Sequence, residues 1–223
     1  MKNLTYFVAI LMGFGTISGR VCAAEEAPAH PVNIVIVRTG EQLQGPHVLT
    51  YRLAEWEQMR GRWIPADFGY YDTGYGQDQI WFGGGGVVVT ARPRFRWEQE
   101  VYVSQETGPQ SANRRAVWIW PVIYLQPKPR LSIQVAPYPT IPLDRAQRWG
   151  FNFDRAKMEW SINSRWRAGV GYAGGICSAR TWQNEPFLTA TRRTHFGNFE
   201  TWLQSMPGGA QVQLRYVLVK GEN

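Results

Sequence analysis

The alternation of apolar and polar residues over residues 156–173 is the most informative pattern in this chain. Apolar or aromatic residues occupy most even positions from Met158 to Tyr172, and charged, polar or glycine residues occupy the odd positions. Successive side chains of a strand point to opposite faces, so the pattern predicts one long strand with an apolar face and a polar face. Ordinary strands have about 5–6 residues. A much longer strand with aromatics on its apolar face is typical of a wall between lipid and water.

Further strand-like segments follow one another along the C-terminal part of the chain, with turn residues between them. We place them at about 79–91, 94–105, 115–126, 130–143, 156–173, 186–194, 198–206 and 210–219. This spacing, without intervening helices, predicts consecutive antiparallel hairpins. A sheet that crosses a membrane must close on itself, because open edges cannot be satisfied in hydrocarbon. The sequence therefore predicts an all-β fold, an antiparallel up-and-down β-barrel of about 8–10 strands that is transmembrane.

The first 24 residues have the order of a secretory signal peptide. A basic start at Lys2 is followed by an apolar run and then by small residues that end at Ala24. This order predicts a signal peptide over residues 1–24 and export of the rest. Export combined with barrel-like strands indicates the outer membrane of a Gram-negative cell envelope. A periplasmic location is the alternative.

The remaining chain is interpreted in two parts. Residues 25–78 form an N-terminal extension with a short strand and a loop, and residues 79–223 form the barrel, to which the extension can add strands. Residues 48–63 fit either a short helix or an extended segment. Residues 65–78 are rich in glycine and aspartate, which predicts a loop.

The aromatic content of the chain helps to decide between lipid and a protein core. Phe, Trp and Tyr make up 14% of the residues, and membrane barrels place such residues in girdles at the two lipid–water boundaries. Trp160 and Trp166 would lie about 20 Å apart along one strand, close to the height of the lipid-facing band. Two other uses of tryptophan stay open, namely the core of a soluble β-sandwich and stacking on sugar rings.

Two sets of site residues follow if the aromatic faces point outward. The lipid-facing set is Trp160, Ile162, Trp166, Val170, Tyr172, Leu214 and Tyr216. The lumen-facing set is the charged residues Arg96, Glu98, Glu100, Glu159, Arg165, Arg167 and Arg215. In a barrel of eight strands these charges must pair and fill the interior, whereas ten or more strands leave a narrow aqueous route. The formal charge of +7 predicts a weak anion preference if the barrel conducts. It is too diffuse to indicate nucleic acid.

Four prolines complicate the barrel. Pro121 lies in one predicted strand, and Pro137, Pro139 and Pro142 lie in the next. Proline removes a ladder donor and is usually confined to strand ends, edges or bulges. These residues predict either that the second strand frays beyond Val135 or that the sheet is not fully closed there.

Candidate chemistry is sparse. The run Gly83–Gly86 lacks the Gly-Lys-Ser/Thr of a phosphate loop, and we interpret it as a place of bending or close backbone approach. His195 follows Thr194 and would come within reach of Ser205 if the two strands around it pair. No Gly-x-Ser-x-Gly elbow is present. We therefore predict no catalytic residues, no metal site and no cofactor.

Taken together, the alternation over Lys157–Tyr172, the turn Pro207-Gly208-Gly209 and the strand Gln211–Val219 resemble a small bacterial outer-membrane β-barrel protein. The resemblance is to this class and covers roughly residues 79–219. It implies contact with outer-membrane lipid, insertion by the barrel-assembly machinery and recognition of the last strand. Such proteins often end on an aromatic residue, whereas this chain continues past Tyr216. The sequence does not predict an oligomeric state.

Three functions are compatible with these features. The first is a non-catalytic outer-membrane barrel, serving as an envelope component or a small pore. The second is a soluble periplasmic β-sandwich or a lipocalin-like protein that binds a ligand or carbohydrate. The third is an outer-membrane lipid hydrolase, for which His195 is the candidate base.

Overall fold

The computed structural model describes residues 31–43, 49–73, 78–108, 114–144, 149–176, 182–206 and 209–221. The predicted signal peptide lies outside these residues. The described residues form twelve β-strands and no helix, and therefore no helix long and apolar enough to cross a membrane. The strands are β1 (Val32–Gln42), β2 (Leu49–Arg60), β3 (Trp63–Thr73), β4 (Asp78–Arg92), β5 (Phe95–Thr107), β6 (Arg115–Lys128), β7 (Leu131–Pro142), β8 (Gly150–Ser161), β9 (Trp166–Ile176), β10 (Gln183–Thr194), β11 (Gly197–Met206) and β12 (Gly209–Lys220).

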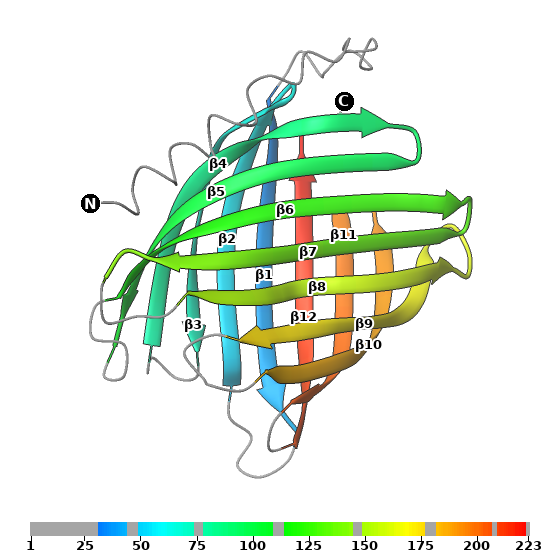
Figure 1. Cartoon of the computed structure of the whole chain (residues 1–223). Helices are drawn as coiled ribbons and strands as arrows, with labels where there is room; N and C mark the ends of the chain where they lie inside the picture. The colour runs from blue at the N-terminus through cyan, green and yellow to red at the C-terminus, as the bar shows by residue number, and fades with distance from the viewer. Residues whose placement is uncertain are drawn as a thin grey trace.

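The strands form a closed antiparallel barrel. Each strand pairs with its neighbours along the chain, and β1 pairs with β12 from Asn33–Lys220 to Gln42–Gln211, which removes the free edges. In Figure 1 the strands β6 to β10 cross in front of β1, β2 and β12 at a steep angle, as the tilt of a closed sheet requires. The predicted fold class is confirmed. The described strands number twelve, more than the eight to ten expected.

The two ends of the barrel differ in their connections. Short turns join β2 to β3, β4 to β5, β6 to β7, β8 to β9 and β10 to β11, and β1 begins and β12 ends at the same end. We call this the turn end. The other connections lie at the opposite end, which we call the loop end. The predicted turn Pro207-Gly208-Gly209 joins β11 to β12 at the loop end, and its first two residues lie outside the described residues.

The long strand predicted over residues 156–173 is wrong, because the segment is a hairpin. Strand β8 ends at Ser161 and β9 begins at Trp166. The side chain of Asn163 makes the turn, since its Oδ1 accepts hydrogen bonds from the backbone N–H groups of Arg165 and Trp166, both at 2.9 Å. Ser161 pairs with Arg167, so an odd number of residues, five, separates the last paired residues of the hairpin. Paired residues point to the same face, so even positions point outward on both strands and the alternation continues through the turn without a break.

The N-terminal region contributes three strands to the barrel. The ambiguous segment 48–63 is mainly β2, and most of the predicted loop 65–78 is β3. The loop predicted from the glycines and aspartates of this segment is wrong for residues 65–73. Gly69 lies inside β3, where an added Cβ would come within 2.4 Å of the Phe82 ring. The glycine therefore leaves room for an aromatic side chain of the neighbouring strand.

The prolines do not make a strand fray, and the barrel stays closed. Instead, the ladder between β6 and β7 has pairs from Ala116–Pro142 to Trp118–Thr140 and resumes at Ile123–Val135. The intervening stretch, 119–122 on β6 and 136–139 on β7, contains Pro121, Pro137 and Pro139. These residues have no backbone N–H to donate, so the gap is confined to the place where donors are missing.

Candidate functional site: the barrel lumen

The polarity of this barrel is inverted relative to that of a soluble domain. Many of its most deeply buried side chains are charged or polar, among them Glu98, Glu100, Lys157, Glu159, Glu200 and Gln204. Many large apolar side chains are exposed instead, among them Val37, Phe68, Val103, Val170, Leu188 and Leu203. Soluble domains bury apolar residues and rarely bury Lys or Glu. The site is therefore the interior of the barrel, and the exterior is an apolar surface.

The residues predicted to face lipid are placed as follows. Trp160, Trp166, Val170 and Leu214 are exposed on the outside of the barrel, and Tyr172 and Tyr216 are partly exposed. Ile162 is exposed in the turn between β8 and β9 rather than in a strand. Trp160 and Trp166 both lie near the turn end, on either side of this turn. The predicted separation of about 20 Å along one strand is therefore wrong.

The residues predicted to line the lumen are mostly buried. Glu98, Glu100 and Glu159 are buried, and Arg167 and Arg215 are largely covered. Arg96 is more open, lies in the cavity at the turn end and contacts Glu98. Arg165 is an exception, because it lies exposed in the β8–β9 turn and lines neither cavity of the lumen.

Strands β8–β12 together with β1 form a part of the lumen wall that we call the paired wall. Lys157 Nζ lies 2.6 Å from Glu200 Oε1 and 3.3 Å from Glu159 Oε2. Arg215 Nη1 lies 3.4 Å from the second oxygen of Glu200. The Thr191 hydroxyl donates to Glu159 Oε1 at 2.6 Å. Each buried carboxylate here has a cation and further donors, which is the condition under which buried charge is tolerated.

Aromatic stacking fills part of the paired wall. The Phe187 and Trp202 rings stack at 4.0 Å and 6°, and the Arg38 guanidinium lies 4.3 Å from the Trp202 ring centroid. Gly171 makes room for this stack, because an added Cβ would lie 2.2 Å from Cζ of Phe187. Glycine at this position thus serves side-chain packing across neighbouring strands.

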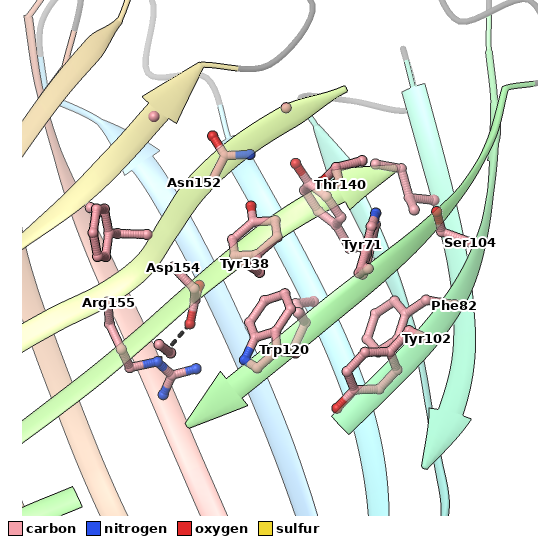
Figure 2. Close-up of a pocket in the computed structure, with 18 of the residues that line it drawn as sticks. Tyr71, Phe82, Tyr102, Ser104, Trp120, Tyr138, Thr140, Asn152, Asp154 and Arg155 are labelled. Atoms are coloured by element: carbon pink, nitrogen blue, oxygen red, sulfur yellow. Dashed lines mark hydrogen bonds and ion pairs between the residues drawn. The ribbon is translucent and has the colours of Figure 1, made fainter. Parts of the chain in front are cut away.

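Strands β2–β7 form the rest of the wall, which we call the open wall. It borders a cavity of about 1310 Å³ that reaches the loop end, where Ser104, Arg114 and Asp144 line it. Six aromatic side chains on β4–β7 line this cavity: Phe82, Tyr102, Trp118, Trp120, Tyr124 and Tyr138. Figure 2 labels four of them, Phe82, Tyr102, Trp120 and Tyr138, which point into one space with Asp154 and Arg155 of β8 beside it. The alternation along the strands predicts aromatics on the outside of the barrel, and it does not predict this inward cluster.

The glycine run on β4 underlies the packing of the open wall. Gly84 pairs with Asp67 on one side and with Tyr102 on the other. The Tyr102 hydroxyl crosses this bare strand and donates to Asp67 Oδ2 at 2.7 Å. It also contacts Glu100. A Cβ at Gly84 would lie 2.0 Å from the Val101 carbonyl oxygen, so the close backbone approach predicted for this run is observed.

A second cavity of about 540 Å³ reaches the turn end. Its charged lining is mainly basic, with Arg92, Arg94, Arg96, Arg130, Lys157, Arg167, Arg193 and Arg215 against Glu57, Glu159 and Glu200. The loop-end cavity has the opposite balance, with Glu55, Glu57, Glu98, Glu100, Glu106, Asp144, Asp154 and Glu185 against Arg38, Arg114, Arg115, Arg155 and Arg215. Both cavities are lined by Ile36, Glu57, Tyr124, Gln134 and Arg215, so they adjoin at this level.

An ion pair ties the start of β6 to the residues after β7 at the loop end. Asp144 accepts from the Arg115 backbone N–H at 2.8 Å and from its guanidinium at 3.1 Å. These two donors, the backbone N–H first, lower the pKa of the Asp144 carboxyl below its ordinary value. Asp144 therefore carries a negative charge at the mouth of the larger cavity at neutral pH.

The residues suggested for hydrolysis are not brought together. His195 lies in the turn between β10 and β11, at the turn end. Thr194 pairs with Gly197, whereas Ser205 pairs with Ala210 at the other end of β11. The hydroxyl of Ser205 is thus about eight strand residues away, or roughly 26 Å. Among the described residues, no group of three or more His, Cys, Asp or Glu side chains is arranged to hold a metal ion.

Comparison with known proteins identifies the fold. No family model matches the sequence, and no curated protein matches it. Among solved structures, the KdgM porin superposes with a TM-score of 0.57 at 9% identity, covering 85% of this chain and 100% of the porin. A second structure of that porin, described as a complex with disordered oligogalacturonate, gives 0.56 over 85% and 99% of the two chains, again at 9% identity. An outer-membrane channel from Pseudomonas putida F1 gives 0.52 at 10% identity, over 90% and 100%. The fold is that of outer-membrane β-barrel channels.

Proposed function

We propose that this chain is a non-catalytic outer-membrane barrel whose lumen is a narrow channel for small solutes. The inverted polarity supports this function most directly. The exposed apolar side chains outside need a solvent other than water, and a barrel satisfies all of its backbone groups within the sheet. Charged side chains inside suit a water-filled interior rather than a lipid one.

The orientation follows from the connections. Outer-membrane barrels have short turns on the periplasmic side and longer loops outside. The turn end, where β1 begins and β12 ends, therefore faces the periplasm in this proposal. The larger, more acidic cavity then opens to the exterior, and the basic cavity opens to the periplasm.

The solute is small and follows the lumen from one cavity to the other. Eight strands enclose just enough space for side chains, and twelve enclose more. The two cavities adjoin at a level that Ile36, Glu57, Tyr124, Gln134 and Arg215 line, and we assign the constriction to this level. One similar barrel is described as a complex with oligogalacturonate. The acidic balance of the loop-end cavity argues against an acidic saccharide as the solute of this chain.

The charge balance also changes the expected ion preference. The net positive charge of the chain predicted a weak preference for anions, but the positive charges are concentrated in the turn-end cavity. We propose that the loop-end cavity admits cations preferentially, because its carboxylates outnumber its arginines.

Insertion into the membrane requires the barrel-assembly machinery, and the last strand, β12, is the part that we propose it recognises.

Folding and conductance measurements test this function. The mature chain, refolded into lipid vesicles, should migrate differently in gels before and after boiling, and in planar bilayers it should conduct ions. Heat-denatured protein is the control. A protein that folds as a monomer in buffer without detergent would contradict the proposal and favour the periplasmic binder. Insertion without conductance would restrict the function to that of an envelope component.

A further inference from the structure

The open wall combines an aromatic surface with carboxylates on the same face. The Trp120 and Tyr138 rings stack at 4.2 Å and 14°, and the Tyr102 ring stands nearly perpendicular to Trp120 at 6.0 Å. Glu100 is the direct cross-strand neighbour of Trp120, so their Cβ atoms lie about 5 Å apart. All four residues line the 1310 Å³ cavity.

Four carboxylates of the open wall lack a cationic partner. Glu55 and Glu57 on β2, Asp67 on β3 and Glu100 on β5 have no Lys or Arg within ion-pair distance among the described residues. Electrostatic interactions link Glu57 to the other three. Asp67 is only 1% exposed, and its Oδ1 has no hydrogen-bond donor. Glu100 is buried as well, whereas Glu55 and Glu57 are partly exposed to the lumen. Clustered carboxylates without cations are costly where they are buried, so this wall is complementary to a positive charge.

The arginines on the other side of the lumen are held by their own partners. Arg38 Nη1 lies 3.0 Å from Asp154 Oδ1, and Arg155 Nε donates to Asp154 Oδ2 at 2.6 Å. Arg215, Arg155 and Arg38 interact with Glu55 electrostatically, Arg215 most strongly, but none of the three lies within ion-pair distance of it. A gap therefore separates the carboxylates of the open wall from the cations of the paired wall, and the cavity occupies it.

We propose that the open wall is a binding site for an organic cation, namely an ammonium compound that also carries an apolar or aromatic body. The positive group lies near Glu57 and Glu100, and the body lies against Trp120 and Tyr138. Aromatic faces together with carboxylates form the kind of cage that recognises quaternary ammonium groups, where cation–π attraction adds to the charge interaction. This proposal deepens the channel function, and rests on it only for the route by which the solute enters.

Calorimetric titration of the refolded protein in detergent micelles tests the site without requiring conductance. The probes are benzyltrimethylammonium, the neutral benzyl alcohol and the anion phenylacetate. Benzyltrimethylammonium should bind at least ten times more tightly than the other two. Glu57→Gln, Glu100→Gln and Trp120→Leu should each weaken its binding about five- to tenfold. Glu41→Gln, on an exposed position of β1 outside the cavity, is the charge-matched control and should leave the affinity unchanged.

The outcomes separate this proposal from the channel function. Equal binding of all three probes, or binding that Glu100→Gln and Trp120→Leu leave unaltered, would overturn the cation site. Calcium chloride, titrated separately, would overturn it as well if calcium bound and benzyltrimethylammonium did not. The heat-dependent gel shift establishes that each variant is folded, and the wild-type probe series decides the question even if a variant fails to fold. If the barrel binds the cation but does not conduct ions, the cation site is supported and the channel function is contradicted.

Discussion

Lys157 of the paired wall lies between Glu159 and Glu200, with an ion pair to each. On the open wall, Glu55 and Glu57 belong to the same closed sheet and line the same lumen, yet no cation of the described residues forms an ion pair with them. In the paired wall the charged side chains thus pair with one another and fill the interior. In the open wall the carboxylates remain available to a ligand. Charged residues that alternate with apolar ones along a strand therefore do not determine whether the lumen is filled by side chains or open to a ligand. This depends on the side chains that face them from other strands of the barrel.

Removing the central cation of the paired wall should have the largest effect. Lys157→Met removes the nearest cation of both Glu159 and Glu200 and leaves them only the longer contacts to Arg167 at 3.9 Å and Arg215 at 3.4 Å. The change should lower the free energy of unfolding by about 3–5 kcal/mol. Glu57→Gln on the open wall removes a carboxylate that has no cation, so stability should change by less than about 1 kcal/mol or rise. Urea titration in lipid vesicles measures both. Similar losses from the two variants would erase the distinction between the walls.

The outer surfaces of the two walls, by contrast, should behave alike. Val170 on β9 and Val101 on β5 are both exposed near the middle of their strands. Arginine at either position should cost about 2–4 kcal/mol if lipid surrounds the barrel, and arginine at Ile162, in the turn, should cost about 0–1 kcal/mol. The same vesicle titrations apply. A small cost at Val101 alone would mean that lipid does not cover the outside of the open wall.

Glycine substitutions probe the packing of each wall and should have the smallest effects. Gly84→Ala on the open wall and Gly171→Ala on the paired wall place a Cβ against the Val101 carbonyl oxygen and the Phe187 ring, respectively. Each should cost about 1–3 kcal/mol, as overpacking does. Gly83→Ala is the matched control, because its nearest contact would be an ordinary 3.7 Å to Phe68. A cost at Gly83 equal to that at Gly84 would show that backbone flexibility, not space, selects these glycines.

The barrel class could be predicted from the sequence because alternation survives wherever one face is apolar and the other polar. The same property concealed the hairpin at residues 162–165. An odd number of residues between paired positions, here the five between Ser161 and Arg167, keeps the outward parity. The Asn163 turn signal is short compared with the alternation around it. The strand number was underestimated for this reason, and also because β3 contains Gly69, which local rules assign to a turn.

The candidate site could be predicted only in part. Glu98, Glu100 and Glu159 alternate with apolar residues, so their inward direction is readable from the chain. Around Trp118 and Trp120, the residues on both faces of β6 are apolar or proline, and no pattern distinguishes inside from outside. Which charges pair depends on contacts between strands far apart in sequence, such as that of Lys157 with Glu200.

The charges of the lumen are also separated along its axis, from the acidic loop end to the basic turn end. In the proposed channel, mobile cations gather in the first half and mobile anions in the second. A voltage that is positive at the loop end drives both populations toward the junction and enriches it in carriers, whereas the opposite voltage empties it. The lumen therefore has the charge profile of an ionic diode, and the current through the proposed channel should depend on the sign of the membrane potential, most strongly at low salt.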